Sequence, residues 1–198
     1  MRRKEETMVD DGDSEVEADE DIDEFADYFK DNTPPKLMIT TNRRPSGKMF
    51  EFLKDLKAII PNAYYYERKN FKIKDILKWA SNKKFTNVII FIEKGGVPHT
   101  MIMSHLPKGP TAHYRVSSVK PMSEIVNRSR MTEHQPEMIM NHFDTKLGHR
   151  TGRMLASMFP QVPEFEGRRV ITFHNQRDFI FFRHHHYEFN EDGTRANL

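Results

Sequence analysis

The sequence predicts an α/β fold built from two duplicated half-domains, each a mixed β-sheet with packed helices. The first indication is an internal repeat, because a strand, a basic glycine-bearing turn, an amphipathic helix and a proline follow one another at residues 37–61 and again at 137–160. The second is the segment NVIIFIE at 87–93, whose unbroken apolar run is typical of a strand buried on both faces. Helices with one apolar face must pack on such sheets. We place the half-domains at about 36–120 and 121–189.

In the first half-domain, KLMITT at 36–41 predicts a strand and RRPSGK predicts the turn into a helix that ends at Pro61. That helix carries Met49, Leu53 and Leu56 on one face. Further elements follow as strands or helices by the same criteria: strand 63–67, helix 71–82, and strands 87–93, 99–106 and 111–119. Alternating strands and helices of this kind predict a mixed sheet.

The second half-domain repeats this order in a shorter form. EMIMNHF at 137–143 is strand-like, DTKLGHR is the basic turn, and the next helix stops at Pro160. RRVITFHN at 168–175 and DFIFFRHHHYEF at 178–189 then predict a hairpin around Gln176 and Arg177.

The charge is divided sharply along the chain. Residues 1–33 hold 14 Asp/Glu against 4 Lys/Arg, and the remaining 165 residues hold 15 acids against 27 bases. An acidic tail beside a basic body is typical of nucleic-acid-binding proteins, although a solvated basic surface has the same composition. Cysteine is absent, which excludes disulfides, thiolate ligands and cysteine nucleophiles. We expect a soluble protein that meets no membrane.

The two chain ends carry separate expectations. Residues 1–33 have too few apolar side chains to offset the entropy of ordering, so we expect a disordered acidic tail. Within it, Ile22, Phe25 and Phe29 have helical spacing and could form a docking segment, 22–29, that folds in a partner's groove. The alternative is a solvated tail that touches its own domain weakly. Residues 190–198 add no predicted element.

Both basic turns predict anion sites at helix N-termini. RRPSGK fails the pattern of a nucleotide-binding phosphate loop, because Asn42 and Met49 stand where glycine and a hydroxyl residue are needed. A positively charged helix N-terminus can still hold a phosphate without catalysis. The candidate contacts are Arg43, Arg44 and Lys48 in the first turn and His149, Arg150 and Arg153 in the second. The alternative is ordinary turn chemistry with solvated cations.

The run of histidines at 184–186 invites a metal or acid–base interpretation that the rest of the sequence does not favour. On a strand His184 and His186 share one face and His185 points to the other, so at most two can converge. A zinc site would need further ligands from distant segments, without cysteine. No paired carboxylate or nucleophile accompanies the run. We therefore expect no metal, no cofactor, no small-molecule substrate and no enzyme.

Aromatic rings alternate with cations in the predicted hairpin, a composition suited to stacking bases and contacting phosphates. We expect Ile171, Phe173, Phe179 and Phe181 to bury one face and Thr172 to lie at an edge. The candidate RNA contacts in this stretch are Arg168, Arg169, His174, Arg177, Arg183 and His184. The turn PKGPTAHYR adds Lys108, His113 and Arg115. Each could be structural instead, with His113 satisfying backbone groups and Arg115 paired with Glu124.

Four blocks of the sequence resemble successive parts of a Brix domain, the module of ribosome-assembly factors. They are KLMITTNRRPSGK, SHLPKGPTAHYRVSSV, NHFDTKLGHRTGRMLASMFP and FEGRRVITFHNQRDFIFFRHHHYEF, and together they cover residues 36–189 in family order. The segments GPTAH, GRMLAS and TFHNQRDFIFFRHH, with the acidic DEFADYF before them, are more similar to a large-subunit member than to the small-subunit processome member.

The resemblance implies a fold in which each half is similar to the anticodon-binding domain of certain aminoacyl-tRNA synthetases. It also implies a non-catalytic nuclear and nucleolar protein that binds pre-ribosomal RNA during large-subunit assembly and rRNA processing, beside other assembly factors and ribosomal proteins. A protein scaffold within pre-ribosomal particles and a small-subunit processome role remain the alternatives. One departure is that the family's next segment, a GPRF-like strand, does not follow NEDGTRANL, so we expect a truncated end and an exposed edge of the second sheet.

Overall fold

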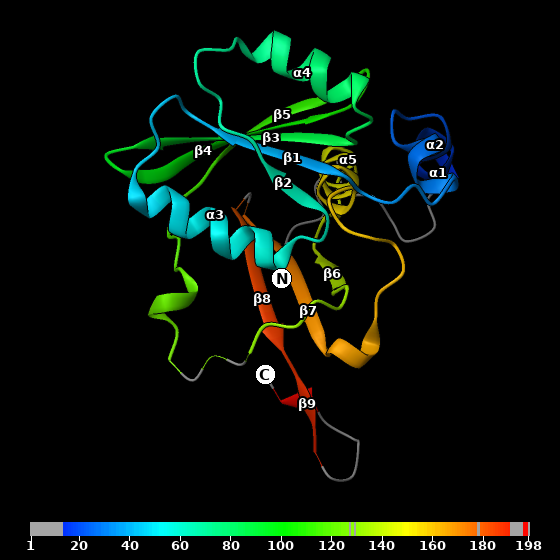
Figure 1. Cartoon of the computed structure of the whole chain (residues 1–198). Helices are drawn as coiled ribbons and strands as arrows, with labels where there is room; N and C mark the ends of the chain where they lie inside the picture. The colour runs from blue at the N-terminus through cyan, green and yellow to red at the C-terminus, as the bar shows by residue number, and fades with distance from the viewer. Residues whose placement is uncertain (1–13, 127, 129, 178, 191–195, 198) are drawn as a thin grey trace. The chain divides into compact units, whose positions relative to one another are not determined.

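The computed structural model describes residues 14–126, 128, 130–177, 179–190 and 196–197, which form two compact units (Figure 1). The contiguous unit is Pro34–Glu133, and the discontinuous unit joins the residues before Pro34 to those from His134 onward. The expected division at residue 120 therefore falls inside the contiguous unit. Among the described residues no helix is both long and apolar enough to cross a bilayer.

The contiguous unit is a five-stranded mixed sheet in the order β2-β1-β3-β4-β5. Its strands are β1 (Leu37–Thr41), β2 (Ala63–Tyr65), β3 (Asn87–Lys94), β4 (Val97–His105) and β5 (Thr111–Arg115). Strand β1 pairs in parallel with β2 and β3, and the β3–β4 and β4–β5 pairs are antiparallel. The predicted strands are all present, and β2 and β5 form the two edges.

Helices α3 (Gly47–Ile59) and α4 (Ile73–Asn82) cover opposite faces of this sheet (Figure 1). Met38, Val88 and Ile90 pack with the α4 side, where Ile76 and Ala80 are buried. On the other face the Phe52 ring of α3 lies edge-on to Phe91, with ring centroids 5.0 Å apart. Because both faces are covered, the central strands β1 and β3 are almost wholly buried, as the unbroken apolar run predicts.

The discontinuous unit repeats this arrangement in a shorter form, with a three-stranded sheet in the order β6-β7-β8. Its main elements are β6 (Glu137–Asn141), α5 (Lys146–Ala156), β7 (Arg169–Gln176) and β8 (Phe179–His186). Strands β6 and β7 are parallel and β7 and β8 antiparallel, which matches β1, β3 and β4 of the contiguous unit. The α/β class and the two mixed sheets with packed helices are confirmed.

Two glycines allow α5 to approach β6 closely. A Cβ on Gly148 would lie 3.0 Å from the backbone of Phe143, and one on Gly152 would lie 3.1 Å from the methyl group of Met140. Thr145 caps the helix by accepting a hydrogen bond from the Gly148 amide at 2.9 Å. Because α5 lies close to β6, Met154 and Leu155 are buried in the core of this unit.

The part of the acidic segment that the structure describes is folded, whereas the sequence predicts disorder. It forms α1 (Ser14–Asp21) and α2 (Ala26–Lys30). Phe25 is fully buried, Tyr28 is nearly so, and the Tyr28 hydroxyl donates a hydrogen bond to the Ser157 carbonyl at 3.0 Å. The physical reason is a tertiary contact, because Tyr28 bonds to the residue that follows α5, far away in the sequence. Residues 1–13 lie outside the described residues.

The proposed docking segment 22–29 is thus divided between interior and surface. Phe25 is buried within its own unit and Phe29 is half-buried, whereas Ile22 is 82% exposed. A partner groove could therefore meet Ile22 but not Phe25, and we withdraw Phe25 as a docking residue.

The remaining described elements are short. They are the 3₁₀ turns η1 (Met122–Glu124) and η2 (Phe165–Gly167) and the strands β9 (Glu188–Phe189) and β10 (Ala196–Asn197). Strands β9 and β10 pair with each other in antiparallel fashion.

Candidate nucleic-acid interface

The sheet of the discontinuous unit has one face packed toward α5 and one face that α5 does not cover. The hairpin register pairs Phe173 with Phe182 and His174 with Phe181. Side chains alternate along a strand, so Ile171, Phe173 and Phe182 share the α5 face. The opposite face, which we call the open sheet face, carries Thr172, His174, Gln176, Phe179, Phe181, Arg183 and His185, together with Val170, which is buried near the start of β7.

The aromatic rings on the open sheet face are exposed. Phe179 is 68% and Phe181 is 42% exposed, so the prediction that they would be buried with Ile171 and Phe173 was wrong. The reason is register, because each cross-strand pair joins an odd-numbered residue of β7 to an even-numbered residue of β8 or the reverse. The odd-numbered phenylalanines of β8 therefore face away from the odd-numbered core residues of β7.

Cations surround these exposed rings. The Arg183 guanidinium carbon lies 5.6 Å from the centroid of the Phe181 ring. His174, the neighbour of Phe181 across the hairpin, makes an edge-to-face contact with His142 at 5.0 Å between centroids. Arg177 is exposed in the hairpin turn, and Arg168 is exposed just before β7. Exposed rings with adjacent guanidinium groups can stack bases and neutralise phosphates.

Two of the candidate RNA contacts in the hairpin, Arg169 and His184, lie inside the discontinuous unit. Arg169 is 2% exposed, and its Nη1 donates to the His134 carbonyl at 2.7 Å while its Nε donates to Nε2 of His184 at 3.2 Å. Burial, and after it the positive charge of Arg169, lower the pKa of His184 to about 4, so the ring is neutral near pH 7 and accepts this hydrogen bond. Arg169 and His184 are therefore structural and leave the candidate surface.

The first basic turn already has a bound anion, which is the carboxylate of Glu93. The Ser46 amide donates to both oxygens of Glu93 at 3.0 and 3.1 Å, and the Ser46 hydroxyl donates at 2.7 Å. Burial alone would raise the pKa of Glu93, but the hydrogen bonds from Ser46 and Asn42 outweigh it and lower the pKa. The N-terminus of α3 is thus satisfied internally, while Arg43, Arg44 and Lys48 remain exposed around it.

Lys108 lies in the β4–β5 turn and His113 and Arg115 lie on the edge strand β5 of the contiguous unit, and all three are exposed. His113 and Arg115 point to the same side of β5. Within the described part of the chain Arg115 forms no ion pair with Glu124, so the structural alternative for this arginine finds no support.

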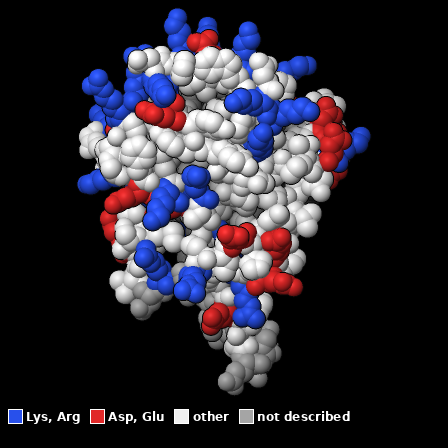
Figure 2. All heavy atoms as spheres, in the orientation of Figure 1, with Lys and Arg blue, Asp and Glu red and all other residues white. Residues whose placement is uncertain are grey.

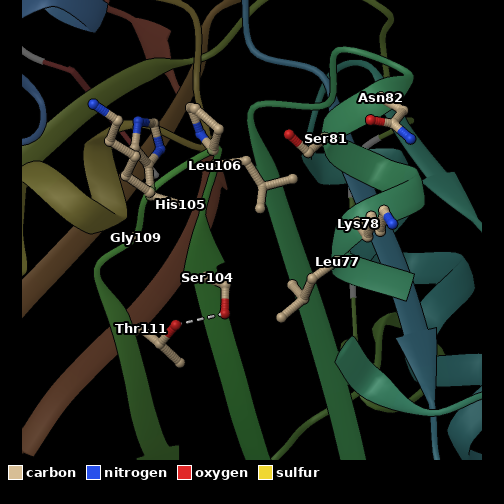
Figure 3. A pocket seen from close by; sticks show the side chains of 11 residues that line it. Leu77, Lys78, Ser81, Asn82, Ser104, His105, Leu106, Gly109 and Thr111 are labelled. Atoms are coloured by element: carbon tan, nitrogen blue, oxygen red, sulfur yellow. Dashed lines mark hydrogen bonds between the residues drawn. The ribbon is translucent and has the colours of Figure 1, made fainter. Parts of the chain in front are cut away.

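Lys108 also lines a pocket of about 350 Å³ between α4 and the β4–β5 turn (Figure 3). Figure 3 shows Ser104 and Thr111 joined by a hydrogen bond, 2.8 Å long, on its wall. None of the described residues that line the pocket is a carboxylate, and His105 is held by Asn87 at 2.9 Å. Such a lining offers cations and hydroxyls to an anion but no acid–base pair.

The second basic turn is occupied by the acidic segment of the same unit, whose carboxylates gather at α1 and α2 (Figure 2). Asp23 accepts from Arg153 at 2.8 and 2.9 Å, His149 lies 3.0 Å from Glu20, and Arg150 pairs with Glu24. The side chains of His149, Arg150 and Arg153 therefore meet carboxylates, and RNA would have to displace these carboxylates. Sequence analysis did not identify these acidic partners, although their density in one helical segment was visible.

No group of three or more residues able to hold a metal ion occurs among the described side chains. His184 and His186 do share a face, with ring centroids 5.3 Å apart, but among the described residues no third ligand forms a group with them.

The fold and the surface together define a class of protein: an α/β chain in which two related mixed sheets display cations and exposed rings. The chain belongs to the Brix domain family, whose model matches residues 42–197. The resemblance of the four sequence blocks to this family is confirmed.

Curated relatives named ribosome production factor 1 are similar to nearly the whole chain. Ribosome production factor 1 from Pongo abelii is 48% identical over 97% of this chain and 55% of its own length. Ribosome production factor 1 from Saccharomyces cerevisiae is 42% identical over 93% of this chain and 62% of its own. The chain thus spans a little more than half the length of these curated relatives.

The fold is also found in a solved structure. The crystal structure of a probable ribosomal biogenesis protein from Aeropyrum pernix K1 is similar, with a TM-score of 0.54 and 16% identity over 77% of this chain and 90% of that one. At this identity the likeness shows the fold alone.

Proposed function

We propose that this chain is a ribosome-biogenesis factor that binds pre-ribosomal RNA in the nucleolus during assembly of the large subunit. The relatives named ribosome production factor 1 support the pathway. The observation that carries RNA binding is the open sheet face, where Phe179 and Phe181 are exposed beside Arg183. Exposing aromatic rings to water costs free energy, which a bound partner with flat apolar surfaces would recover. Unstacked bases have such surfaces.

The protein would act by holding RNA and not by chemistry on it. Phe179 and Phe181 stack on bases, and Arg183, Arg177 and Arg168 neutralise the phosphates around them. The exposed cations of the contiguous unit extend the contact to the backbone of the RNA. They are Arg43, Arg44, Lys48, Lys108, His113 and Arg115.

The proposed partners are pre-ribosomal RNA, other large-subunit assembly factors and ribosomal proteins. The rival function is a scaffold held in the particle by proteins alone. The salt dependence of binding separates the two, because each phosphate neutralised on a single strand contributes about −0.7 to the slope of log K against log salt concentration. A steep slope with pre-rRNA fragments supports RNA binding, and a flat one supports the scaffold.

The test of the site uses matched phenylalanines. Phe181→Leu should weaken binding of a single-stranded pre-rRNA fragment by roughly five- to hundredfold, since one stacked base is lost. Phe165→Leu is the control, because Phe165 is also exposed, at 64% against 42% for Phe181, but lies in η2 and not on the sheet. Equal losses in both variants would contradict the proposed site.

Crosslinking of the protein to RNA in cells, followed by sequencing of the adducts, tests the pathway. Recovery of large-subunit precursor sequences is the expected result. Recovery of small-subunit precursor instead would assign the chain to the small-subunit processome.

A further inference from the structure

The contiguous unit exposes a second group of aromatic rings, on or next to β2 and α4, that none of the predicted sites includes. Tyr64, Tyr66, Phe71 and Trp79 are each 43–47% exposed. Tyr64 and Tyr66 flank the buried ring of Phe85, with centroids 6.1 and 6.0 Å away. Phe71 and Trp79 form an edge-to-face pair at 4.9 Å. We call these four residues the β2–α4 aromatic patch.

Lysines lie directly against this patch. Lys83 Nζ is 5.9 Å from the centroid of the Tyr66 ring, and Lys36 Nζ is 4.5 Å from that of Phe85. Lys36 also donates to the Lys83 carbonyl at 3.0 Å, which fixes its ammonium group at the border of the patch. A cation near a ring face is held there by the ring's quadrupole, so both groups present charge where a stacked base would bring its phosphate.

The surrounding segment is strongly basic. Residues 64–85 hold 7 Lys/Arg against 2 Asp/Glu. Figure 2 shows Lys and Arg gathered at the top of the view, where Figure 1 places α4. Within the described part of the chain none of these seven cations forms an ion pair. In this respect the patch differs from α5, whose cations meet carboxylates of the same unit.

We infer that the β2–α4 aromatic patch is a second binding surface, specific for single-stranded RNA. Exposed rings separated by lysines are what an unpaired strand requires, since every base has a flat face and every linkage a phosphate. A duplex would hide its base faces and leave the four rings without contacts. Charge also selects against most protein partners, because among the described residues the lysines next to these rings, Lys36 and Lys83, form no ion pair. This inference rests on the proposed RNA binding. It adds a second surface, whose role can be disproved without disproving RNA binding by the open sheet face.

Trp79 makes the inference directly measurable, because it is the only tryptophan in the chain. The full chain is titrated with a labelled oligouridine of about 12 nucleotides, within the site sizes usual for single strands. Label anisotropy reports total binding, and Trp79 fluorescence reports contact with the patch. The expected result is saturable quenching of Trp79 that weakens with salt, and little quenching by a duplex of the same length.

Variants locate the contact. Tyr66→Leu should weaken the quenching titration by roughly five- to hundredfold. The variant Lys83→Gln should reduce the salt slope by about 0.7. Phe50→Leu is the matched control, because Phe50 is an exposed ring of the same unit that packs with Tyr65 on the α3 side of the sheet. Circular dichroism confirms that each variant is folded.

The outcomes distinguish the two proposals. Anisotropy that rises without quenching, and that falls in Phe181→Leu but not in Tyr66→Leu, would overturn the patch and leave the proposed function standing. No change in either signal would overturn both. Quenching by polyglutamate as strong as by oligouridine would show that the patch takes acidic polypeptide, which also overturns the inference.

Discussion

Arg153 and Asp23 form a two-point ion pair, in which Nε and Nη2 of the arginine donate to the two carboxylate oxygens at 2.8 and 2.9 Å. Both side chains are largely buried, and the guanidinium also lies 5.0 Å from the centroid of the Phe29 ring. Planar pairing of this kind is stronger than a surface contact between single atoms. The acidic segment is therefore joined to α5 by directed bonds and not by general attraction between opposite charges.

Loss of the Asp23 charge should release the acidic segment. We expect Asp23→Asn to lower the free energy of unfolding of the discontinuous unit by about 1.5–3 kcal/mol, because charge-assisted hydrogen bonds are lost from a partly buried site. Amide hydrogen exchange along α5 measures this locally. Asp19→Asn is the control: Asp19 is exposed and 4.0 Å from Lys146, so its effect should stay within about 0.5 kcal/mol. If amide hydrogen exchange along α5 became faster by a similar factor in both variants, the directed pairing of Arg153 with Asp23 would be refuted.

Phe25 should contribute more to stability than any other ring of the acidic segment. Its side chain is fully buried, so Phe25→Ala should cost roughly 3–5 kcal/mol through lost burial and the cavity left behind. Ile22→Ala should change stability by less than about 0.5 kcal/mol, because Ile22 is exposed. Urea unfolding followed by hydrogen exchange compares the two. If Ile22→Ala lowered the stability more than Phe25→Ala, the acidic segment would not pack with Phe25 buried, as it does in the structure.

Arg169 and Arg183 should respond in opposite ways to substitution. Arg169→Met removes the partner of the His134 carbonyl and should destabilise the unit by about 1–3 kcal/mol. Arg183→Gln should leave unfolding almost unchanged but reduce the salt slope of RNA binding by about 0.7. Thermal unfolding and anisotropy titrations measure the two effects. A lower salt slope in Arg169→Met, at a temperature where it is folded, would place that guanidinium on the RNA after all.

The depressed pKa of His184 predicts a loss of stability in mild acid. Its pKa is about 4 in the folded state, against an ordinary value near 6.5, so between these values the unfolded chain binds more protons. The contribution is fully present above about pH 6.5, and it is lost as the pH falls toward 4, at no more than about 1.4 kcal/mol per pH unit.

Urea unfolding at pH 7.5, 6.0 and 5.0 measures this dependence. His184→Asn should flatten it. His185→Gln, on the opposite side of β8, should change it far less, because the charge of His185 is the smallest of the four causes that lower the pKa of His184. If the free energy of unfolding of His184→Asn depended on pH as that of the parent chain does, the acid sensitivity would belong to another group.

Local pattern was sufficient for most elements of the fold. The apolar run at 87–93 and the helical spacing of Met49, Leu53 and Leu56 depend only on neighbours in the sequence, and both elements occur where predicted. The five strands of the first half-domain and the hairpin of the second follow for the same reason.

What the sequence did not reveal depends on contacts between distant segments. The exposure of Phe179 and Phe181 depends on hairpin register, which a single-residue shift would reverse. The seating of Phe25 and Asp23 depends on α5, more than 120 residues further along the chain. The burial of Arg169 likewise requires the His134 carbonyl, which no periodicity indicates. The aromatic patch was missed because Tyr64 and Trp79 come from separate elements.

The division of one unit between the two ends of the chain fixes an order of events during synthesis. Pro34–Glu133 is complete when its last residue leaves the ribosome, and it can then fold as a domain. The helix that carries Arg153 is made later, so Asp23 lacks this partner until 130 further residues have been translated. Until then the aromatic side chains of the acidic segment stay in water, where chaperones can bind them.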